Sequence, residues 1–432
     1  MRLINVLFIE NSGGLGGPTM SLCSLLNFLD DSLFAPHLFQ PHMVLARDEQ
    51  ERYLLGQMRR PGDMTVISPP RPLEQADWAQ RLLGWVDRRA SWLRRGAMSM
   101  LGAVEFFTVS VPYAFEIYRW AKDRKIDLVH HNNGFDLPSV ILSYLLRVPL
   151  VVYQRSEARE SRAIRWLGRR VTRYIANSAE TKQSLASIGV RQNQVMVIYP
   201  PLDLSTFDVE RRAGLSRAAF GVPASSPCVG IIGLLVAWKG QDVFLRAVKR
   251  VLEKVPDAYA FVIGGPPSGG RDYQESLHAL AAELGIAERV VFTGFRTDVP
   301  DVLRLLDVVA HASIKPEPFG RVIAEAMAMG RPVVASNAGG PTEIVENGQT
   351  GFLVPPHDEE ELAARIIELL QDPAMAKRMG EAGRRAALER FSAENHARLV
   401  KNVYTQALGP RWAGRGPERS TQRQARPVVR KN

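Results

Sequence analysis

The sequence contains only two cysteines, Cys23 and Cys228, among 432 residues. One cysteine in each half of the chain excludes a disulfide framework and any zinc site built from cysteine pairs. The first residues lead directly into a short apolar run, without the longer apolar core and small-residue cleavage site of a signal peptide, so we expect none. These absences fit a reducing, cytoplasmic compartment.

The chain has no Asp-x-Asp motif, and no histidines and acidic residues stand at the spacing of metal ligands. We therefore expect neither a metal ion nor another cofactor. The sequence has 55 lysines and arginines but only 45 acidic residues, which gives a formal charge of +10. The basic surplus lies in residues 1–205 and 409–432, so it indicates either solubility alone or attraction to an anionic surface or acceptor.

The alternation of apolar runs and amphipathic stretches predicts repeated strand-helix units. Residues 6–9 are apolar, a glycine-rich segment follows, and an amphipathic stretch runs from Pro18 to Leu29, as at the start of a Rossmann-like unit. Further buried parallel strands are expected at residues 43–45, 65–67, 128–130, 150–153, 174–176 and 195–198. The pattern then restarts, with strands expected at residues 228–233, 259–265, 290–292, 308–310, 332–335 and 351–354.

Two successive sets of such units imply an α/β protein with two Rossmann-like, doubly wound domains that face each other across a cleft. We expect the first domain at residues 1–203 and the second at 204–391. A last amphipathic helix, 392–408, should pack back toward the first domain, and the polar, basic tail 409–432 should be disordered. The cleft, at the carboxyl ends of the strands, is the expected ligand site.

The most informative segment is residues 315–330, in which Glu317 and Glu325 stand on either side of a transition from loop to helix. The first amides of a helix have no partner within it and, with the helix dipole, form a site for phosphate. Glu325 lies among apolar neighbours, where a charge needs a partner. The segment thus predicts an anion site flanked by two carboxylates that can accept hydrogen bonds from sugar and ribose hydroxyls.

This segment resembles the signature of glycosyltransferase family 4, the retaining enzymes with the GT-B fold that are also called glycosyl transferases group 1. Further motifs follow in that family's order: a basic element at residues 233–242, a glycine turn at 264–265, a loop at 292–296 and the segments 336–345 and 351–354. The resemblance is nearly unbroken from Cys228 to Leu408 and looser from Leu3 to Asp203. It implies transfer of a sugar from a nucleotide diphosphate donor, with retention of the anomeric configuration.

The resemblance also implies roles for individual residues. Lys239 would neutralise charge on the leaving diphosphate, Glu317 would bind the transferred sugar, and Glu325 would bind the donor ribose. The other expected donor contacts come from the glycine loop and from backbone groups at Gly16, Gly17, Gly264, Arg296, Phe319, Gly320 and Val322. One position departs from the family, because Leu234 stands where an arginine commonly pairs with the lysine. Three candidates could replace that charge. They are Arg321 itself, a different arginine from the first domain, and the start of the helix.

The family also places a histidine of the first domain at the sugar or reaction centre. Residues 127–133 end a predicted strand, and the register leaves both His130 and His131 open as this catalytic residue. Asn132 is a third candidate for the polar contact. A histidine that only caps the end of the strand is the structural alternative.

Aromatic and basic residues of the first domain indicate its acceptor side. Tryptophans recur every seven residues, each with an arginine three positions later, at Trp78, Trp85 and Trp92. On a helix these residues form adjoining stripes, typical of a membrane-interface helix or of core helices with Trp–Arg stacking. A second basic set includes Arg155, Arg159 and Arg162. It indicates a solvated face or a site for an anionic acceptor, such as a lipid pyrophosphate.

We therefore predict a retaining, metal-independent glycosyltransferase in the cytoplasm, either free or peripheral at the inner face of the cytoplasmic membrane. Its partners would be a nucleotide diphosphate sugar, a cell-envelope polysaccharide or lipid-linked glycan acceptor, and an anionic membrane surface. We expect no nucleic acid partner, because the basic stretches lack the aromatic platforms of a recognisable module. An epimerase or phosphorylase on the same fold is one alternative, and a non-catalytic sugar-nucleotide-binding module is another.

Overall fold

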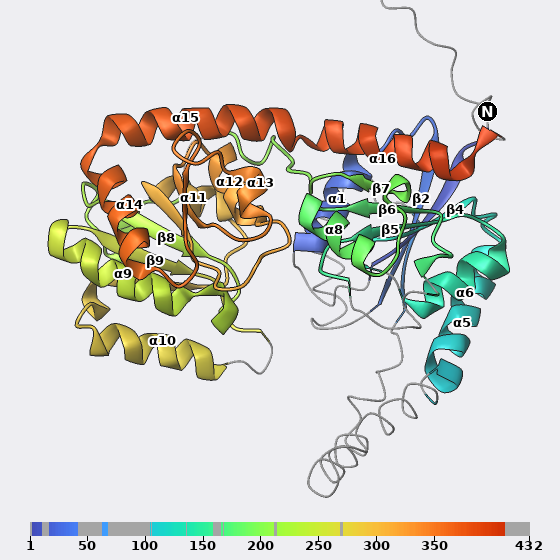
Figure 1. Cartoon of the computed structure of the whole chain (residues 1–432), viewed down its shortest axis with the longest axis horizontal. Helices are drawn as coiled ribbons and strands as arrows, with labels where there is room; N and C mark the ends of the chain where they lie inside the picture. Colours follow the sequence, from blue (N-terminus) through green and yellow to red (C-terminus); the bar gives the residue numbers. More distant parts are fainter. Residues whose placement is uncertain are drawn as a thin grey trace, which may run out of the picture.

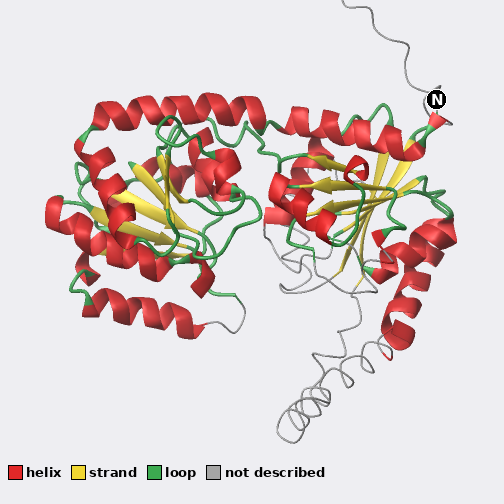
Figure 2. Ribbon diagram, viewed as in Figure 1, coloured by secondary structure: helices red, strands yellow, loops and turns green. Residues whose placement is uncertain are grey.

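The computed structural model describes residues 2–10, 17–41, 63–67, 104, 106–134, 136–158, 166, 168–210, 214–267 and 271–410. These residues form two parallel sheets, each flanked by helices (Figures 1 and 2). Buried apolar side chains lie on both faces of each sheet. The two doubly wound α/β domains predicted from the sequence are therefore confirmed.

The first sheet has seven strands in the order β3-β2-β1-β4-β5-β6-β7. They are β1 (Ile4–Ile9), β2 (Phe34–Pro41), β3 (Asp63–Ile67), β4 (Leu128–His131), β5 (Leu150–Gln154), β6 (Arg173–Ala176) and β7 (Val195–Val197). The described helices of this half are α1 (Gly17–Phe28), the π-helix η3 (Phe106–Ser110), α5 (Val111–Lys122), α6 (Leu137–Leu146), α8 (Ala179–Ser187) and the short 3-10 helix η4 (Gln192–Gln194). The strand order reverses between β1 and β4, and in open parallel sheets ligands bind at the carboxyl ends of the strands beside such a reversal.

The second sheet has six strands in the order β10-β9-β8-β11-β12-β13. They are β8 (Cys228–Ile232), β9 (Tyr259–Ile263), β10 (Val290–Gly294), β11 (Val308–His311), β12 (Val333–Ser336) and β13 (Phe352–Val354). Its described α-helices are α9 (Gln241–Lys254), α10 (Arg271–Glu283), α11 (Val299–Leu305), α12 (Arg321–Ala328), α13 (Pro341–Ile344), α14 (Glu359–Gln371) and α15 (Pro373–Arg390). Here the order reverses between β8 and β11, so the ends of these two strands are the corresponding position in the second sheet.

The last helix, α16 (Ala393–Leu408), continues from α15 and lies against the first domain (Figure 1). Its residues Val400, Val403 and Tyr404 share a hydrophobic core with Val6 and Phe8 of β1. Burial of each such side chain stabilises the fold by roughly 1.5–3 kcal/mol. The helix therefore completes the first domain, although the second domain precedes it in the sequence.

The chain crosses between the domains at two neighbouring points. The linker residue Leu202 donates its N–H to the carbonyl of Phe391 at 2.8 Å, and Ala393 donates to the carbonyl of Leu202 at 3.1 Å. Leu202 is fully buried. The linker after β7 and the junction between α15 and α16 are thus tied together by backbone hydrogen bonds.

Strand β2 corrects the sequence analysis, which predicted no strand between the one at residues 6–9 and the one at 43–45. Its segment contains Pro36 and Pro41, and proline normally argues against a central strand because it lacks an N–H donor. Nevertheless β2 pairs with both β1 and β3, with Pro36 opposite Val6. The strand predicted at residues 43–45 and residues 411–432 of the predicted tail lie outside the described residues. Among those described, no helix is both long and apolar enough to cross a bilayer.

Candidate functional site

A loop after β8 brings Lys239 to the carboxyl end of β11. Gly240 has a φ of 69°, and a Cβ atom there would lie 2.0 Å from the carbonyl oxygen of Ala312. The backbone N–H of Ile314 donates to the carbonyl of Trp238 at 2.9 Å. Only glycine fits this close, left-handed turn. The loop that carries Lys239 is therefore held against the loop that leads to Glu317.

The side chain of Glu317 is held at both carboxylate oxygens. Its Oε1 lies 2.6 Å from the Lys239 Nζ atom. Its Oε2 accepts a hydrogen bond from His311 Nε2 at 2.6 Å and another from the Ser313 hydroxyl at 3.0 Å. The side chains of Glu317 and Lys239 are 12% and 16% exposed, so the pair is partly accessible rather than enclosed.

The electrostatics of this cluster keep Glu317 ionised. Burial opposes the charged form, but His311 and Lys239 outweigh this effect, so the pKa of Glu317 lies well below its ordinary value. An ionised carboxylate is only an acceptor of hydrogen bonds. Glu317 can therefore accept from the hydroxyl groups of a ligand throughout the physiological pH range.

The backbone of Glu317 is fixed by the loop after β12. The N–H of Gly340 donates to the Glu317 carbonyl at 2.7 Å. Gly339 has a φ of 74°, and a Cβ atom there would lie 2.5 Å from that carbonyl oxygen. Helix α12 then begins after Gly320, whose φ is 94°. The glycines thus position the start of α12, with its free amides, directly after Glu317.

Glu325 lies on α12 but is already engaged by a neighbour. Arg321 Nε donates to Glu325 Oε1 at 2.7 Å. The same guanidinium donates to the Ser21 hydroxyl of α1 and to the Pro201 carbonyl, both at 3.1 Å. Arg321 therefore connects the carboxylate of Glu325 to the first domain and to the linker.

The expected glycine turn and base-reading loop lie at the ends of β9 and β10. Gly264 donates its N–H to the Gly294 carbonyl at 3.0 Å, and a Cβ atom at Gly264 would lie 1.8 Å from the Gly233 carbonyl oxygen. The guanidinium of Arg296 pairs with Asp298. These contacts do not test whether the backbone of Arg296 contacts the donor, so that role stays a prediction.

The remaining expected donor residues are placed as follows. Phe319 is buried, and its ring stacks on that of Tyr199 with the ring centroids 5.9 Å apart. Val322 lies in the first turn of α12. Gly17 begins α1, and a Cβ atom there would lie 3.5 Å from Cδ of Arg321. Gly16 lies outside the described residues. The side chain of Leu234 is 53% exposed, so the position where the family commonly has arginine is accessible.

The structure contradicts the expectation that His130 or His131 contacts the sugar, because both are fully buried. Alternation along β4 turns them to opposite faces of the sheet. His130 Nδ1 lies 2.8 Å from the Tyr404 hydroxyl of α16, and burial holds its pKa well below the ordinary value. His131 donates from Nδ1 to the Gly134 carbonyl, with its Nε2 3.4 Å from Asp136 Oδ2. These histidines hold the first domain together.

Arg155 also lies in the interior of the first domain. Its guanidinium donates to the backbone and side-chain oxygens of Asn132, both at 2.8 Å, and stacks on the Tyr153 ring at 3.7 Å. Asn132 in turn donates to the buried carboxylate of Glu10 and to the Pro18 carbonyl. Arg155 is therefore part of a buried network and not of an exposed basic face. The other predicted acceptor-side residues, Trp78, Trp85, Trp92, Arg159 and Arg162, lie outside the described part of the chain.

Sequence reasoning missed Glu343, which reaches from α13 to the first domain. Its two oxygens accept from the backbone N–H of Ala179, each at 2.9 Å, and Oε1 also accepts from Glu180 N–H at 3.2 Å. Its Oε2 accepts from the Tyr199 hydroxyl at 3.1 Å. The carboxylate of one domain thus binds the N-terminus of helix α8 in the other, where the helix dipole favours a negative charge.

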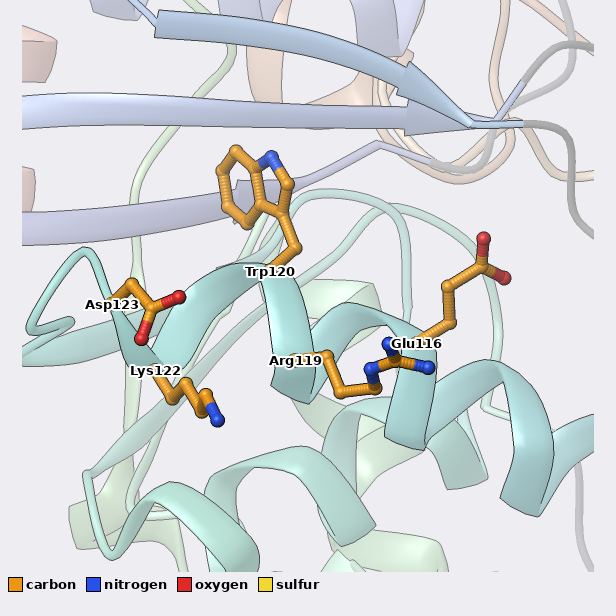
Figure 3. A pocket seen from close by; sticks show the side chains of 5 residues that line it. All are labelled: Glu116, Arg119, Trp120, Lys122 and Asp123. Atoms are coloured by element: carbon orange, nitrogen blue, oxygen red, sulfur yellow. The ribbon is translucent and has the colours of Figure 1, made fainter.

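Sequence reasoning also missed His311 and Ser313. The signal was available, because His311 directly follows the strand predicted at residues 308–310, much as His130 and His131 lie at the end of a predicted strand in the first domain. A surface cavity of about 510 Å³ lies elsewhere, along the C-terminal part of α5. Glu116, Arg119, Lys122 and Asp123 line it, and Trp120 extends toward the strands (Figure 3). Helix α5 and its C-cap Asp123 supply these residues, and none of the predicted site residues is among them.

Known families match both halves of the chain. Residues 52–206 match the family described as Glycosyltransferase Family 4, and residues 215–386 match Glycosyl transferases group 1. The D-inositol 3-phosphate glycosyltransferase of Rhodococcus jostii is 35% identical over 259 residues, which are 59% of this chain and 56% of that protein. The protein of the same name from Streptomyces avermitilis is 35% identical over 243 residues, 55% of this chain and 52% of that protein. The chain thus spans about half the length of these curated relatives.

Solved structures resemble the chain over nearly its whole length. Anabaena Alr3699/HepE in complex with UDP and glucose has a TM-score of 0.74 and 26% identity, and the match covers 93% of this chain and 100% of that one. A glycosyltransferase from Rickettsia africae has a TM-score of 0.76 at 19% identity, over 95% of this chain and 100% of that one, and shows the shared fold.

Proposed function

The chain belongs to the glycosyl transferases group 1, and from this membership we propose that it is a retaining glycosyltransferase that takes its sugar from a nucleoside diphosphate donor. The observation that carries the proposal is the Lys239–Glu317 pair beside the start of α12. A cation, a carboxylate and free helix amides are what a sugar linked to a diphosphate requires of a binding site.

In the proposed complex, the diphosphate lies at the start of α12 and Lys239 turns from Glu317 to the leaving phosphate. The bond between the anomeric carbon and the diphosphate oxygen breaks. The acceptor hydroxyl forms the new carbon–oxygen bond on the same face, and its proton leaves with the nucleoside diphosphate. Lys239 and the helix amides offset the charge that develops on the diphosphate. Because the sequence has no Asp-x-Asp motif, we propose that this charge needs no metal ion.

Glu317 would accept from hydroxyls of the transferred sugar and Glu325 from those of the donor ribose. Ribose binding requires Glu325 to share or exchange its contact with Arg321. We propose a uridine nucleotide as the first donor to test, because Alr3699/HepE was solved with UDP and glucose. For the acceptor we propose a cell-envelope polysaccharide or a lipid-linked glycan, at the inner face of the cytoplasmic membrane. The basic surplus of the first half of the chain supports an acceptor or surface with negative charge.

The proposal is tested by nucleoside diphosphate release from a panel of nucleotide sugars. We expect Lys239→Ala and Glu325→Ala each to lower the release rate about 100-fold or more, because each removes a contact to the donor. Arg250→Ala is the control, since Arg250 of α9 forms an exposed ion pair with Glu360 of α14. Full activity in both site variants would refute the proposal. Turnover of the sugar nucleotide without release of the diphosphate would indicate an epimerase instead.

A further inference from the structure

We propose that His311 and Ser313 are positioning residues for Glu317, which anchor one carboxylate oxygen so that the other is presented to the sugar of the donor. The inference rests on the proposed function, because it assigns the sugar contact to Glu317. It adds His311 and Ser313 to the site as residues that act through Glu317.

The anchor is a closed triangle of three polar groups. Glu317 Oε2 lies 2.6 Å from His311 Nε2 and 3.0 Å from the Ser313 hydroxyl, and these two partners are 3.1 Å apart. His311 and Ser313 are almost wholly buried, with 3% and 1% of their surface exposed. Groups locked in this way fix the orientation of the carboxylate that they hold.

The two oxygens of Glu317 therefore have different partners. Oε2 is held by two buried groups of the β11 end, whereas Oε1 meets Lys239, whose ammonium group is partly exposed. A diphosphate that attracts Lys239 removes the partner of Oε1 but leaves the anchor of Oε2 intact. Oε1 is then free to accept from a sugar hydroxyl in a direction that His311 and Ser313 have already set.

Packing alone does not explain a histidine at this position. The three preceding residues of β11, Val308, Val309 and Ala310, are buried and apolar. His311 Nδ1 is buried and has no hydrogen-bond partner among the described residues. A buried polar atom without a partner is destabilising, so an apolar residue would fill the space at lower cost. The contact that compensates for it is the one from Nε2 to Glu317.

The anchor also supports the charge of Glu317 after Lys239 has moved. Burial opposes this charge, and His311 and Lys239 together hold the pKa of Glu317 below its ordinary value. When the diphosphate attracts Lys239, His311 remains as the neighbour that favours the ionised form. Glu317 thus stays an acceptor in the donor complex.

The test compares binding of UDP with binding of UDP-glucose by calorimetry. His311→Leu removes the donor to Oε2, His311→Gln retains an N–H near the same place, and Ser313→Ala removes the second donor. Ser336→Ala is the matched control, because its buried hydroxyl bonds the His311 carbonyl at 3.2 Å and does not touch Glu317.

We expect His311→Leu to weaken UDP-glucose binding about tenfold and to leave UDP binding within about twofold of the wild type. The loss in Ser313→Ala should be about threefold, and His311→Gln should recover part of the affinity. His311→Leu should also raise the pKa of Glu317, so its UDP-glucose binding should weaken as the pH falls from about 6 to 4 while that of the wild type does not. Equal losses for UDP and UDP-glucose, or none for either, would overturn the positioning role.

A ligand-free crystal structure of each variant separates this inference from the proposed function. A wild-type protein that binds neither nucleotide contradicts the proposed donor. The positioning role is judged independently by the Glu317 carboxylate, which should rotate away from its present orientation in His311→Leu or Ser313→Ala. An unchanged carboxylate in both variants rejects it whatever the donor is.

Discussion

The two domains carry polar side chains at the same edge of their sheets but use them differently. In the second domain, Lys239 and Glu317 meet where both side chains are partly exposed. In the first domain, Glu10, Asn132 and Arg155 are buried, and Asn132 is bonded to each of the other two. Polar residues at the ends of parallel strands thus do not identify a site by themselves. The exposure of the charged atoms distinguishes a cluster that can bind a ligand from one that holds a domain together.

This comparison makes a general prediction. Changes in the buried network of the first domain should alter stability, whereas changes around Glu317 should alter ligand binding. Glu343 connects the two regions and should affect the arrangement of the domains. The three changes below test this distinction, from the largest expected effect to the smallest.

Arg155→Met should lower the free energy of unfolding by about 3 kcal/mol, because it leaves the two buried oxygens of Asn132 without their charged donor. Urea denaturation of the purified proteins measures the difference. Arg191→Met is the control, since Arg191 lies exposed in the same domain. If Arg155→Met has wild-type stability and loses only ligand binding, the first domain's network is a ligand site and the comparison is wrong.

Glu343→Ala should separate the two domains. It leaves the Ala179 and Glu180 amides of α8 without their acceptor and removes the contact with the Tyr199 hydroxyl, at a cost of about 1 kcal/mol. We expect a larger radius of gyration by small-angle X-ray scattering in the absence of ligand. Glu346→Ala, an exposed carboxylate three residues further along, should have no effect. Identical scattering from both variants would show that Glu343 does not hold the domains together.

Asp136→Asn should have the smallest effect, confined to pH dependence. Burial opposes the charge of Asp136, but His131 and Ser139 lower its pKa to about 2, while Asp136 raises the pKa of the buried His131. The carboxylate therefore stabilises the fold above its unfolded pKa of about 4 and loses this effect as the pH falls toward 2. Protonated His131 stabilises the fold below its unfolded pKa of about 6.5 and loses this effect as the pH rises through its folded value.

The pair thus contributes most between about pH 4 and 6.5. In Asp136→Asn, the amide can still cap α6, so only this pH dependence should disappear, and the pKa of His131 should fall in an NMR titration. Asp372→Asn is the control, because Asp372 caps α15 through Met375 N–H in the same way as Asp136 caps α6. A His131 titration that is unaltered in Asp136→Asn would contradict the coupling.

The fold was predictable because its strands are short apolar runs separated by amphipathic helices. The exception was β2, where Pro36 and Pro41 break the usual strand composition. The pairing that overrides these prolines comes from β1 and β3, on either side of β2, and is not visible in the local sequence. The segment around Glu317 was equally readable, since its glycines and its helix are consecutive in the chain.

Contacts between distant segments could not be derived in the same way. The sequence places His131 at the end of a strand. It does not predict that the side chain is buried, because burial depends on how other elements pack around β4. The contact of Glu343 with Ala179 joins residues 164 positions apart. Arg155 shows the same limit, since a series of arginines gave no sign that this one stacks on Tyr153 inside the domain.

Helix α16 has a consequence for the order in which the protein folds on the ribosome. Because Val400, Val403 and Tyr404 complete the core that begins at Val6 and Phe8, the first domain to be synthesised is the last to be finished. The second domain can fold as soon as α15 has emerged from the ribosome. The apolar surface of the first domain that α16 covers stays exposed to solvent until nearly the whole chain has been translated. Nascent chains that stall before residue 392 should accordingly be substrates for chaperones that recognise exposed apolar surface.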